Sequence, residues 1–290
     1  MAIDYPRLKA RPFADVVQHY TARDCILYAL GIGLGQDPLD EAQLRFTYER
    51  GLQMLPTMPV VIGYGGFWLR EPDTGVRWEG VVHGEQRLTI HEPLPTDAVV
   101  VGRTRVDEIV DKGPGRGALV YTSREIRRQD DDRLLCTLQS TAFCRFDGGF
   151  SGGEPAAKAP VQALRPVPDR RPDRSFRFKT APNAALIYRL SGDDNPLHAD
   201  PAVAREAGFE RPILHGLCTY GVAGHAVVTM ACGGDAQRLR RLDVRFTSPV
   251  YPGETLSTEL WFNGDHEAQL RCRVVERDVV VLDHGLAAWA

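Results

Sequence analysis

The stretch that decides the fold is residues 216–230, which read Gly-Leu-Cys-Thr-Tyr-Gly-Val-Ala-Gly-His-Ala-Val-Val-Thr-Met. Its apolar composition predicts a long helix. Glycine and alanine have little or no side chain, so they allow a helix to lie close inside a strongly curved sheet. The residues that serve this purpose are Gly216, Gly221, Ala223 and Gly224.

Strand-like segments follow this helix. Polar and apolar residues alternate in them, as expected of β-strands, and Asn263-Gly264 is a strong hairpin turn between two of them. The segments are 238–248, 255–262, 267–276 and 278–289. A helix wrapped by an antiparallel meander is the arrangement called the hotdog fold. Before the helix, Thr180 is expected to cap a helix that runs to about Leu190.

The first half of the chain repeats this scheme. Four short motifs echo the second half in the same order, the clearest being 54–57 (Met-Leu-Pro-Thr) against 213–216 (Ile-Leu-His-Gly). A two-copy repeat of this length indicates a duplicated domain. We expect a helix over 23–31 and a second helix that starts near Pro59. Strands are expected at 80–91, 98–109, 117–128 and 134–146.

A segment rich in proline and glycine separates the two copies, as a linker does. We therefore divide the chain into an N-terminal degenerate hotdog repeat (1–146), a linker (147–173) and a C-terminal hotdog repeat (174–290). The predicted fold class is α+β. It is a double hotdog with two antiparallel sheets, each wrapped around a central helix.

The composition excludes several classes of function. Lys and Arg number 35 against 38 Asp and Glu, a net charge of −3, so no nucleic-acid partner is expected. The longest nearly apolar stretch, 58–69, is shorter than the ~20 residues of a membrane span, so no membrane association is expected. The first ten residues lack the apolar core of a signal peptide, and the six cysteines form no CxxC pair. We expect buried, reduced thiols and a cytoplasmic protein.

The densest polar cluster is 191–200, Ser-Gly-Asp-Asp-Asn-Pro-Leu-His-Ala-Asp, between two predicted helices. A second motif, 212–217 (Pro-Ile-Leu-His-Gly-Leu), enters the central helix. The residues alone leave two interpretations of Asp193 open, a turn-forming side chain or a catalytic one. Asp200 before Pro201 is expected to cap its own helix.

These motifs resemble a known family. The runs 188–193, 195–198, 208–209 and 211–217 are similar to the R-specific 2-enoyl-CoA hydratases, which are MaoC-like hotdog proteins, and in particular to the hydratase domain of the peroxisomal multifunctional enzyme. Tyr20-Thr21-Ala22-Arg23-Asp24, His83-Gly84-Glu85-Gln86 and Asp111-Lys112-Gly113 extend the likeness to nearly the whole chain.

The resemblance implies reversible hydration of a trans-2-enoyl-CoA to a (3R)-3-hydroxyacyl-CoA, a lyase reaction of fatty acid metabolism and β-oxidation. It also implies an acyl-CoA thioester substrate, no separate cofactor and a homodimer. Asp193 and His198 become the catalytic pair, since residues five apart on a turn can converge on one water. Gly216 becomes the oxyanion hole, because a helix starts there with an unpaired N–H and a favourable dipole.

The resemblance further implies substrate contacts from both halves, with Lys112 on a CoA phosphate and Asn195 orienting the loop or the ligand. Asp194 is also expected to be solvated. The implied substrate-binding residues are His83, Gly84, Lys112, Asp194, Asn195, Pro196, Leu197 and Phe246.

Other histidines receive structural interpretations. His215 is expected to form a hydrogen bond at the start of the central helix, and His225 to be a core or rim residue. Asp193, His198 and His215 have the right ligand types for a metal, but no spacing matches a known metal motif, so no metal is expected.

Two other functions remain open. A hotdog acyl-CoA thioesterase would direct water at the thioester carbon instead of C3. A non-catalytic acyl-CoA-binding protein would need neither Asp193 nor His198, and both are present.

The first half lacks the catalytic pair. Asp40 stands where the second half has His198, and Pro56-Thr57 replaces His215-Gly216. We interpret this half as a retired active site that holds the acyl chain. Its run of glycines, Gly63, Gly65 and Gly66, leaves room for a long or bulky tail.

Overall fold

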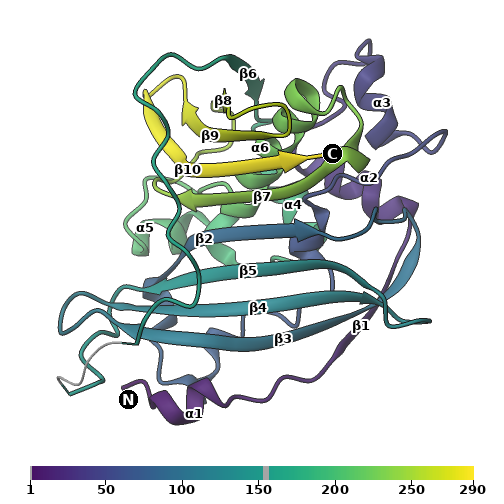
Figure 1. The fold of residues 1–290 in the computed structure, drawn as a ribbon. Coiled ribbons are helices and arrows are strands. Elements are labelled where there is room, and N and C mark those ends of the chain that lie inside the picture. Colours follow the sequence, from purple (N-terminus) through teal and green to yellow (C-terminus); the bar gives the residue numbers. More distant parts are fainter. Residues whose placement is uncertain (1, 153–156) are drawn as a thin grey trace.

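The two halves share one continuous antiparallel sheet with the helices gathered on one face (Figure 1). The computed structural model describes residues 2–152 and 157–290. Within those ranges ten strands run in the order β1-β3-β4-β5-β2-β7-β10-β9-β8-β6. Their bounds are β1 Val16–Tyr20, β2 Val81–Ile90, β3 Ala98–Asp111, β4 Ala118–Arg128, β5 Leu134–Cys144, β6 Arg174–Lys179, β7 Leu239–Phe246, β8 Thr255–Phe262, β9 Glu267–Val274 and β10 Val279–Trp289.

The predicted double hotdog is the observed architecture, with one difference in the sheet. Strand β2 of the first half pairs with β7 of the second, with Glu85 opposite Arg245 and Thr89 opposite Arg241. The two predicted sheets are therefore joined into one. The strands themselves lie within a few residues of their predicted bounds, because alternating burial is a local property of the sequence.

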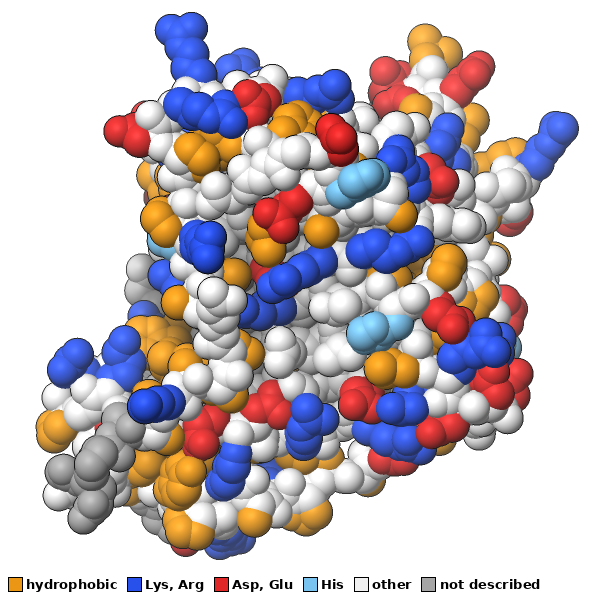
Figure 2. Space-filling model, viewed as in Figure 1, with side chains coloured by type: hydrophobic (Ala, Val, Ile, Leu, Met, Phe, Trp, Pro, Cys, Tyr) orange, Lys and Arg blue, Asp and Glu red, His pale blue; other side chains and the backbone are white. Residues whose placement is uncertain are grey.

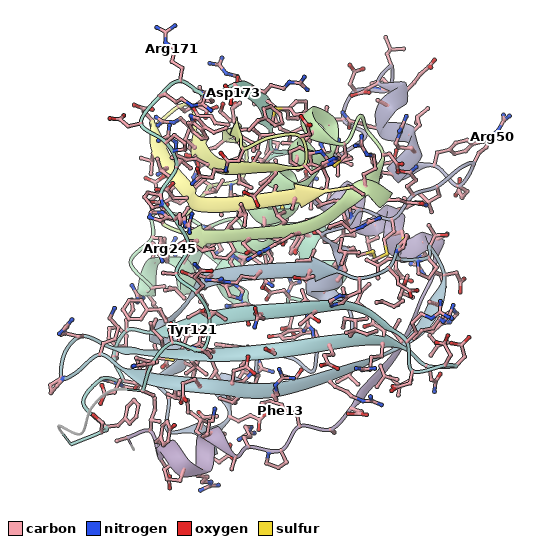
Figure 3. The ribbon with its side chains drawn as sticks, viewed as in Figure 1. Phe13, Arg50, Tyr121, Arg171, Asp173 and Arg245 are labelled. Carbon is pink, nitrogen blue, oxygen red and sulfur yellow. The ribbon has the colours of Figure 1, made fainter. Side chains whose placement is uncertain are left out.

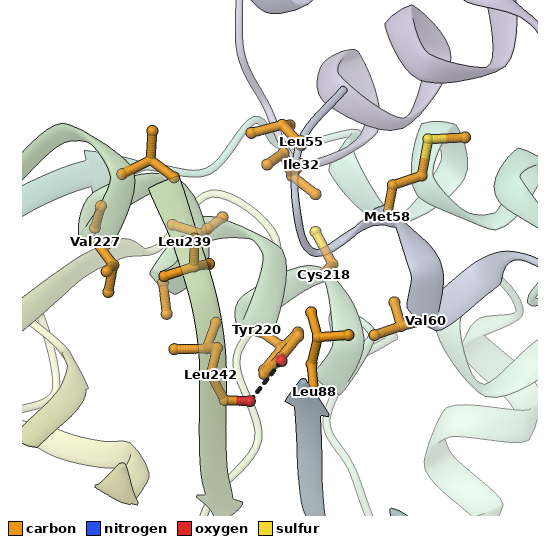
Figure 4. Close-up of a cluster of buried hydrophobic side chains, with 14 of the residues drawn as sticks. Ile32, Leu55, Met58, Val60, Leu88, Cys218, Tyr220, Val227, Leu239 and Leu242 are labelled. Carbon is orange, nitrogen blue, oxygen red and sulfur yellow. Dashed lines mark hydrogen bonds between the residues drawn. The ribbon is translucent and has the colours of Figure 1, made fainter. Parts of the chain in front are cut away.

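Helix α6, Gly216–Ala231, is the predicted central helix. It packs in one hydrophobic core to which both halves contribute, as the close-up in Figure 4 shows for Ile32, Leu88, Cys218 and Leu242. The hydroxyl of Tyr220 donates a hydrogen bond of 2.8 Å to the carbonyl of Leu242 on β7. A shared core of this kind couples the stability of the two halves.

The glycines of α6 allow close packing mainly against residues of the first half, and to a smaller extent against the sheet. A Cβ added to Gly221 would lie 2.7 Å from the Cγ2 of Ile32. A Cβ added to Gly224 would overlap the Cγ2 of Thr57 and lie 3.3 Å from the Cδ2 of Leu242. Of these neighbours only Leu242 belongs to the sheet. The sequence interpretation, close approach to a curved sheet, therefore accounts for only part of the small-residue pattern.

The second predicted central helix, near Pro59, is wrong. Over the described residues of the first half, that region holds four short 3-10 turns: η1 Met58–Val61, η2 Trp68–Arg70, η3 Pro72–Thr74 and η4 Trp78–Gly80. Prolines and glycines interrupt any longer helix there.

The remaining helices are short. They are α1 Tyr5–Lys9, α2 Ala22–Gly31, α3 Glu41–Thr47, α4 Ala184–Tyr188, η5 Arg189–Ser191, η6 Pro196–His198, α5 Pro201–Glu206 and η7 Ala236–Arg238. Asp200 caps α5 as predicted, since its carboxylate accepts from the N–H of Ala202 at 2.7 Å. Thr180 does not cap α4, which begins after Asn183. The Thr180 hydroxyl donates instead to the carbonyl of Glu254, a partner far along the chain.

Residues 157–173, which precede β6, cross the outer face of the sheet (Figure 1). Residues 153–156 of the predicted linker lie outside the described residues. Beyond them, the carbonyl of Gln162 accepts from Arg87 at 2.8 Å and that of Pro166 accepts from Gln269 at 2.6 Å. The outer face of the sheet beneath this segment carries charges of both signs (Figure 2). One of them belongs to Arg245, labelled in Figure 3, which pairs with Glu85 at 2.8 Å.

All six cysteines lie in the described ranges, and each is free and buried, in line with the sequence. No helix within residues 2–152 and 157–290 has the length and apolarity that a membrane span requires.

Candidate active site

The loop 191–198 is shaped by local backbone chemistry. Gly192 adopts a left-handed φ of 116°, which lets the chain turn after η5. The carboxylate of Asp193 accepts from the N–H of Asn195 at 3.3 Å, and the side chain of Asn195 accepts from the N–H of Leu197 at 3.1 Å, capping η6. Asp193 therefore forms the turn that one interpretation required. That bond involves one carboxylate oxygen, Oδ1.

His198 is held in a single orientation at the end of this loop. It is buried, and its Nδ1 lies 2.9 Å from the carbonyl oxygen of Ile213. A carbonyl can only accept, so the proton is on Nδ1 and the neutral ring keeps a lone pair on Nε2. Burial lowers the pKa of His198, while the charge of Asp193 opposes that shift. The imidazole is thus neutral at physiological pH and able to take a proton.

His215 stands directly before α6 and faces the same loop. Its Nε2–H donates to the backbone carbonyl of Asp193 at 3.1 Å, which confirms the predicted structural hydrogen bond. The rings of His215 and His198 stack with centroids 3.8 Å apart. Burial, followed by the neighbouring His198, lowers the pKa of His215. Two adjacent imidazoles are therefore both neutral.

Three side chains converge at this point. One carboxylate oxygen of Asp193, one ring nitrogen of His198 and one of His215 all lie within 4.8 Å of one another. A single water molecule can contact groups at such separations. The sequence predicted the convergence of Asp193 and His198, and it did not place the ring of His215 beside them.

The amino end of α6 borders the same place. The carbonyl of His215 already accepts from the amides of Cys218 and Thr219, whereas the amide of Gly216 finds no acceptor among the described residues. A Cβ at Gly216 would come within 3.2 Å of the ring of Phe246. Glycine therefore lets the ring of Phe246 lie against the start of α6, where the free N–H stands at the positive end of a 16-residue helix.

The first half contributes the opposite wall. The ring of His83 stacks on that of Phe246 with centroids 5.5 Å apart. A β-bulge between His83 and Glu85 places Gly84 at an irregular step of β2, where the β2–β7 pairing begins. The site thus lies across the junction of the two halves.

The chain is similar to known proteins over nearly its whole length. Residues 163–284 match the family described as MaoC like domain, and residues 18–146 match the MFE-2 hydratase 2 N-terminal domain. The chain is 37% identical to "Enoyl-CoA hydratase 2, peroxisomal" of Arabidopsis thaliana, over 95% of this chain and 92% of the relative. It is 39% identical to "3-hydroxyacyl-thioester dehydratase Y" of Mycobacterium tuberculosis, over 100% and 99%. A solved MaoC-like dehydratase from Phytophthora capsici superposes with a TM-score of 0.85, at 34% identity and 98% coverage of both chains.

The chain belongs to the MaoC-like hydratase family. It is accordingly a hydro-lyase of the hydratase and dehydratase class. The first half matches a domain model of its own, in keeping with the duplication inferred from the sequence echoes.

Lys112 of this hydro-lyase lies apart from the loop. It is exposed in the hairpin between β3 and β4, with its ammonium 5.8 Å from the ring centroid of Phe143. The register places it at the same sheet end as His83, three strands away, which is roughly 14 Å at ~4.8 Å per strand. Exposed Arg116 and Arg145 lie at that end too, so it is locally basic.

The other residues of the loop differ in exposure. Asp194 and Pro196 are exposed, while Asn195 and Leu197 are half-buried. The backbone carbonyl of Asp194 accepts from Arg189 at 3.2 Å. Asn195 orients the loop by capping η6, as one of its two predicted roles required.

Two residues of the first half were not singled out from the sequence. Tyr64 lies in the glycine-rich run, within electrostatic range of Asp193, and the guanidinium of Arg124 sits 5.2 Å from the centroid of its ring. Arg124 also donates to the carbonyls of Pro59 and Val60. No spacing in the sequence connects these residues to 191–198, because the fold alone brings them across the junction.

Proposed function

We propose that this protein catalyses the reversible hydration of a trans-2-enoyl-CoA to a (3R)-3-hydroxyacyl-CoA, with Asp193 and His198 activating the water. The observation that carries the proposal is the convergence of the Asp193 carboxylate and a nitrogen of His198 beside the free amino end of α6. The names of the two relatives describe an enoyl-CoA hydratase and a 3-hydroxyacyl-thioester dehydratase, whose reactions are the two directions of one conversion.

The chemistry follows from the donor and acceptor pattern. Water bound between Asp193 and the Nε2 lone pair of His198 loses one proton to the pair as its oxygen bonds to C3. The C2–C3 π bond breaks, and the electron pair moves to the thioester carbonyl as an enolate. A proton then reaches C2 from the same pair. Addition of both groups from one side is syn, and the proposed (3R) product further requires that the water attack the corresponding face of C3.

Gly216 stabilises the enolate in this proposal. Charge develops on the thioester oxygen, and a backbone N–H at the start of a helix is aimed at it without reorganisation. His215 holds the Asp193 backbone in place through its 3.1 Å hydrogen bond, so it acts as a positioning residue.

The binding roles divide between the repeats. We propose that residues 1–146 contact the acyl chain and CoA, and that residues 174–290 carry out catalysis. Over its described residues the first half has only short 3-10 turns where the second half has α6, and this difference supports an acyl chain there. His83, Gly84 and Phe246 would flank the thioester, and the basic end around Lys112 would meet CoA phosphates. The loop residues Asp194, Asn195, Pro196 and Leu197 would border the pantetheine.

The test measures crotonyl-CoA hydration by loss of absorbance of the double bond. Asp193→Asn and His198→Gln should each lower turnover by ~10²–10⁴-fold while folding normally, the usual contribution of a positioned acid or base. Asp200→Asn is the matched control, because asparagine still caps α5. Near-normal turnover in either loop variant would contradict the assignment.

A thiol reagent in the same assay separates the other candidate functions. Hydration releases no free CoA, a thioesterase releases it, and a binding protein changes neither signal. Chiral analysis of the product tests the (3R) assignment. The absence of a separate cofactor, homodimer formation and cytoplasmic location stay predictions.

A further inference from the structure

We propose that Asp111 is a positioning residue for coenzyme A, because its buried carboxylate fixes the hairpin that carries Lys112 and Arg116. The hairpin is the turn 112–117 between β3 and β4. The proposal rests on one part of the proposed function, the binding of CoA phosphates at Lys112. Asp111 does not touch the ligand and acts through the hairpin.

The carboxylate of Asp111 joins two separate segments of the chain. Asp111 is buried, and its Oδ1 accepts from the N–H of Gly113 at 2.8 Å and from that of Gly149 at 2.7 Å. Its Oδ2 accepts from the N–H of Ser151 at 2.8 Å. Gly113 belongs to the hairpin, whereas Gly149 and Ser151 follow β5. One side chain therefore ties the hairpin to the chain beyond β5.

These hydrogen bonds are made by an ionised group. Burial by itself raises the pKa of Asp111, but the hydrogen bonds that the carboxylate accepts outweigh burial and leave the pKa at about 2. The carboxylate is therefore charged near neutral pH. Hydrogen bonds to an ionised acceptor are stronger than those between neutral groups, so the tie is a firm one.

The hairpin needs such a tie because its backbone is permissive. Gly113, Gly115 and Gly117 all adopt left-handed φ values, of 97°, 71° and 77°. Glycine has more conformational freedom than any other residue, so three of them in one turn hold its shape poorly. Within the hairpin the N–H of Lys112 donates to Gly117 at 3.0 Å, and the N–H of Arg116 donates to Gly113 at the same distance.

The tied segment also packs directly on the hairpin. A Cβ added to Gly148 would overlap the carbonyl oxygen of Gly113 and lie 2.7 Å from the nitrogen of Gly117. The two backbones are thus in contact. The hydrogen bonds from Gly149 and Ser151 to Asp111 hold them in that position.

A hairpin fixed in advance should bind phosphates more tightly. Lys112 and Arg116 are exposed, and ordering such groups on binding weakens the affinity for a ligand. The charge of Asp111 has the opposite effect, because an anion repels phosphate. Loss of the charge alone would strengthen CoA binding, whereas loss of the tie weakens it. The sign of the change therefore separates positioning from plain electrostatics.

The test measures KM and kcat of the full chain with crotonyl-CoA and with crotonyl-pantetheine, which lacks the phosphates. Asp111→Asn keeps the size of the side chain but offers one acceptor oxygen to three N–H donors. It should raise KM for crotonyl-CoA by about 10-fold, the effect of leaving one or two long side chains unordered. It should leave kcat, and KM for crotonyl-pantetheine, within about two-fold.

Two further variants complete the experiment. Ser151→Pro removes one N–H donor and keeps the charge, so it should raise KM for crotonyl-CoA by about 3-fold, and it serves if Asp111→Asn fails to fold. The matched control is Asp130→Asn, which removes the same charge from an exposed aspartate beyond the other end of β4. It should behave as the unmodified chain does.

Lys112→Met tests whether Asp111 acts through the hairpin. It should raise KM for crotonyl-CoA, and its combination with Asp111→Asn should raise KM by less than the product of the two single effects. An unchanged or lowered KM in folded Asp111→Asn would overturn the proposal. An equal rise with crotonyl-pantetheine, or a double effect equal to the product, would overturn it too.

Titration of coenzyme A in a calorimeter separates this proposal from the proposed function, since binding requires no hydration. Weaker binding by Asp111→Asn in a chain that does not hydrate crotonyl-CoA would support the role of Asp111 and refute the proposed reaction. Hydration by the unmodified chain with equal CoA binding by Asp111→Asn would do the reverse.

Discussion

Gly224→Ala should destabilise the protein because it pushes a methyl group into Thr57. The added Cβ would overlap the Cγ2 of Thr57, a fully buried residue of the first half. Overpacking of this kind costs ~1–3 kcal/mol, and the higher helix propensity of alanine offsets ~1 kcal/mol of it. The expected net loss in the free energy of unfolding is therefore up to ~2 kcal/mol.

Thr57→Ser should rescue that variant. Serine lacks the Cγ2 methyl but keeps the hydroxyl that accepts from Tyr28 at 3.1 Å. Alone it should cost ~1 kcal/mol, the value of one buried methyl group. Combined with Gly224→Ala, the new methyl fills the vacated space, so both costs disappear. The double variant should be about as stable as the unmodified chain, a coupling of up to ~3 kcal/mol.

Urea unfolding of the four chains measures this coupling from the shift of the transition midpoint. Thr74→Ser is the matched control, since Thr74 is equally buried but is not among the neighbours of a Cβ at position 224. It should combine with Gly224→Ala additively, within ~0.5 kcal/mol. Additive losses for Thr57→Ser as well would refute the view that the glycine makes room for the first half.

Three further outcomes are expected. Burial lowers the pKa of His225 to about 4, below its value of ~6.5 in the unfolded chain. The contribution of His225 to the free energy of unfolding is therefore present above pH 6.5 and is lost as the pH falls. In urea unfolding, the free energy of unfolding of the unmodified chain should fall between pH 7 and pH 5 by about 2 kcal/mol more than that of His225→Phe. The exposed His91→Phe should behave as the unmodified chain. Equal losses in the unmodified chain and His225→Phe would contradict this prediction. Asp40→Asn keeps the cap of α3 and should retain the hydration rate within about two-fold, because Pro56-Thr57 replaces the oxyanion hole in the first half. A large loss of turnover would show that the first-half site is active. Residues 174–290 expressed alone should be insoluble or inactive, because β7 loses its partner β2 and the shared core is exposed; a soluble, active fragment would show that the first half is dispensable.

The sequence contains enough local information for the elements and for part of the site. The alternation of polar and apolar residues predicts the strands, and the apolar run predicts α6. Asp200 before Pro201 predicts the cap of α5. Asp193 and His198 are close in sequence, so a single turn brings them together. Such features depend on neighbours a few residues apart, and a pattern within one segment is sufficient to predict them.

Contacts between distant segments were decided only by the tertiary structure. Thr180 favours the carbonyl of Glu254 over a helix cap, and the ring of His215 stacks on His198 only after α6 has docked. The pairing of β2 with β7 joins two expected sheets, and Gly224 is small because Thr57 of the other half lies against it. Each of these depends on which surfaces pack together. That choice is governed by burial of the whole shared core, which no short stretch of the sequence specifies.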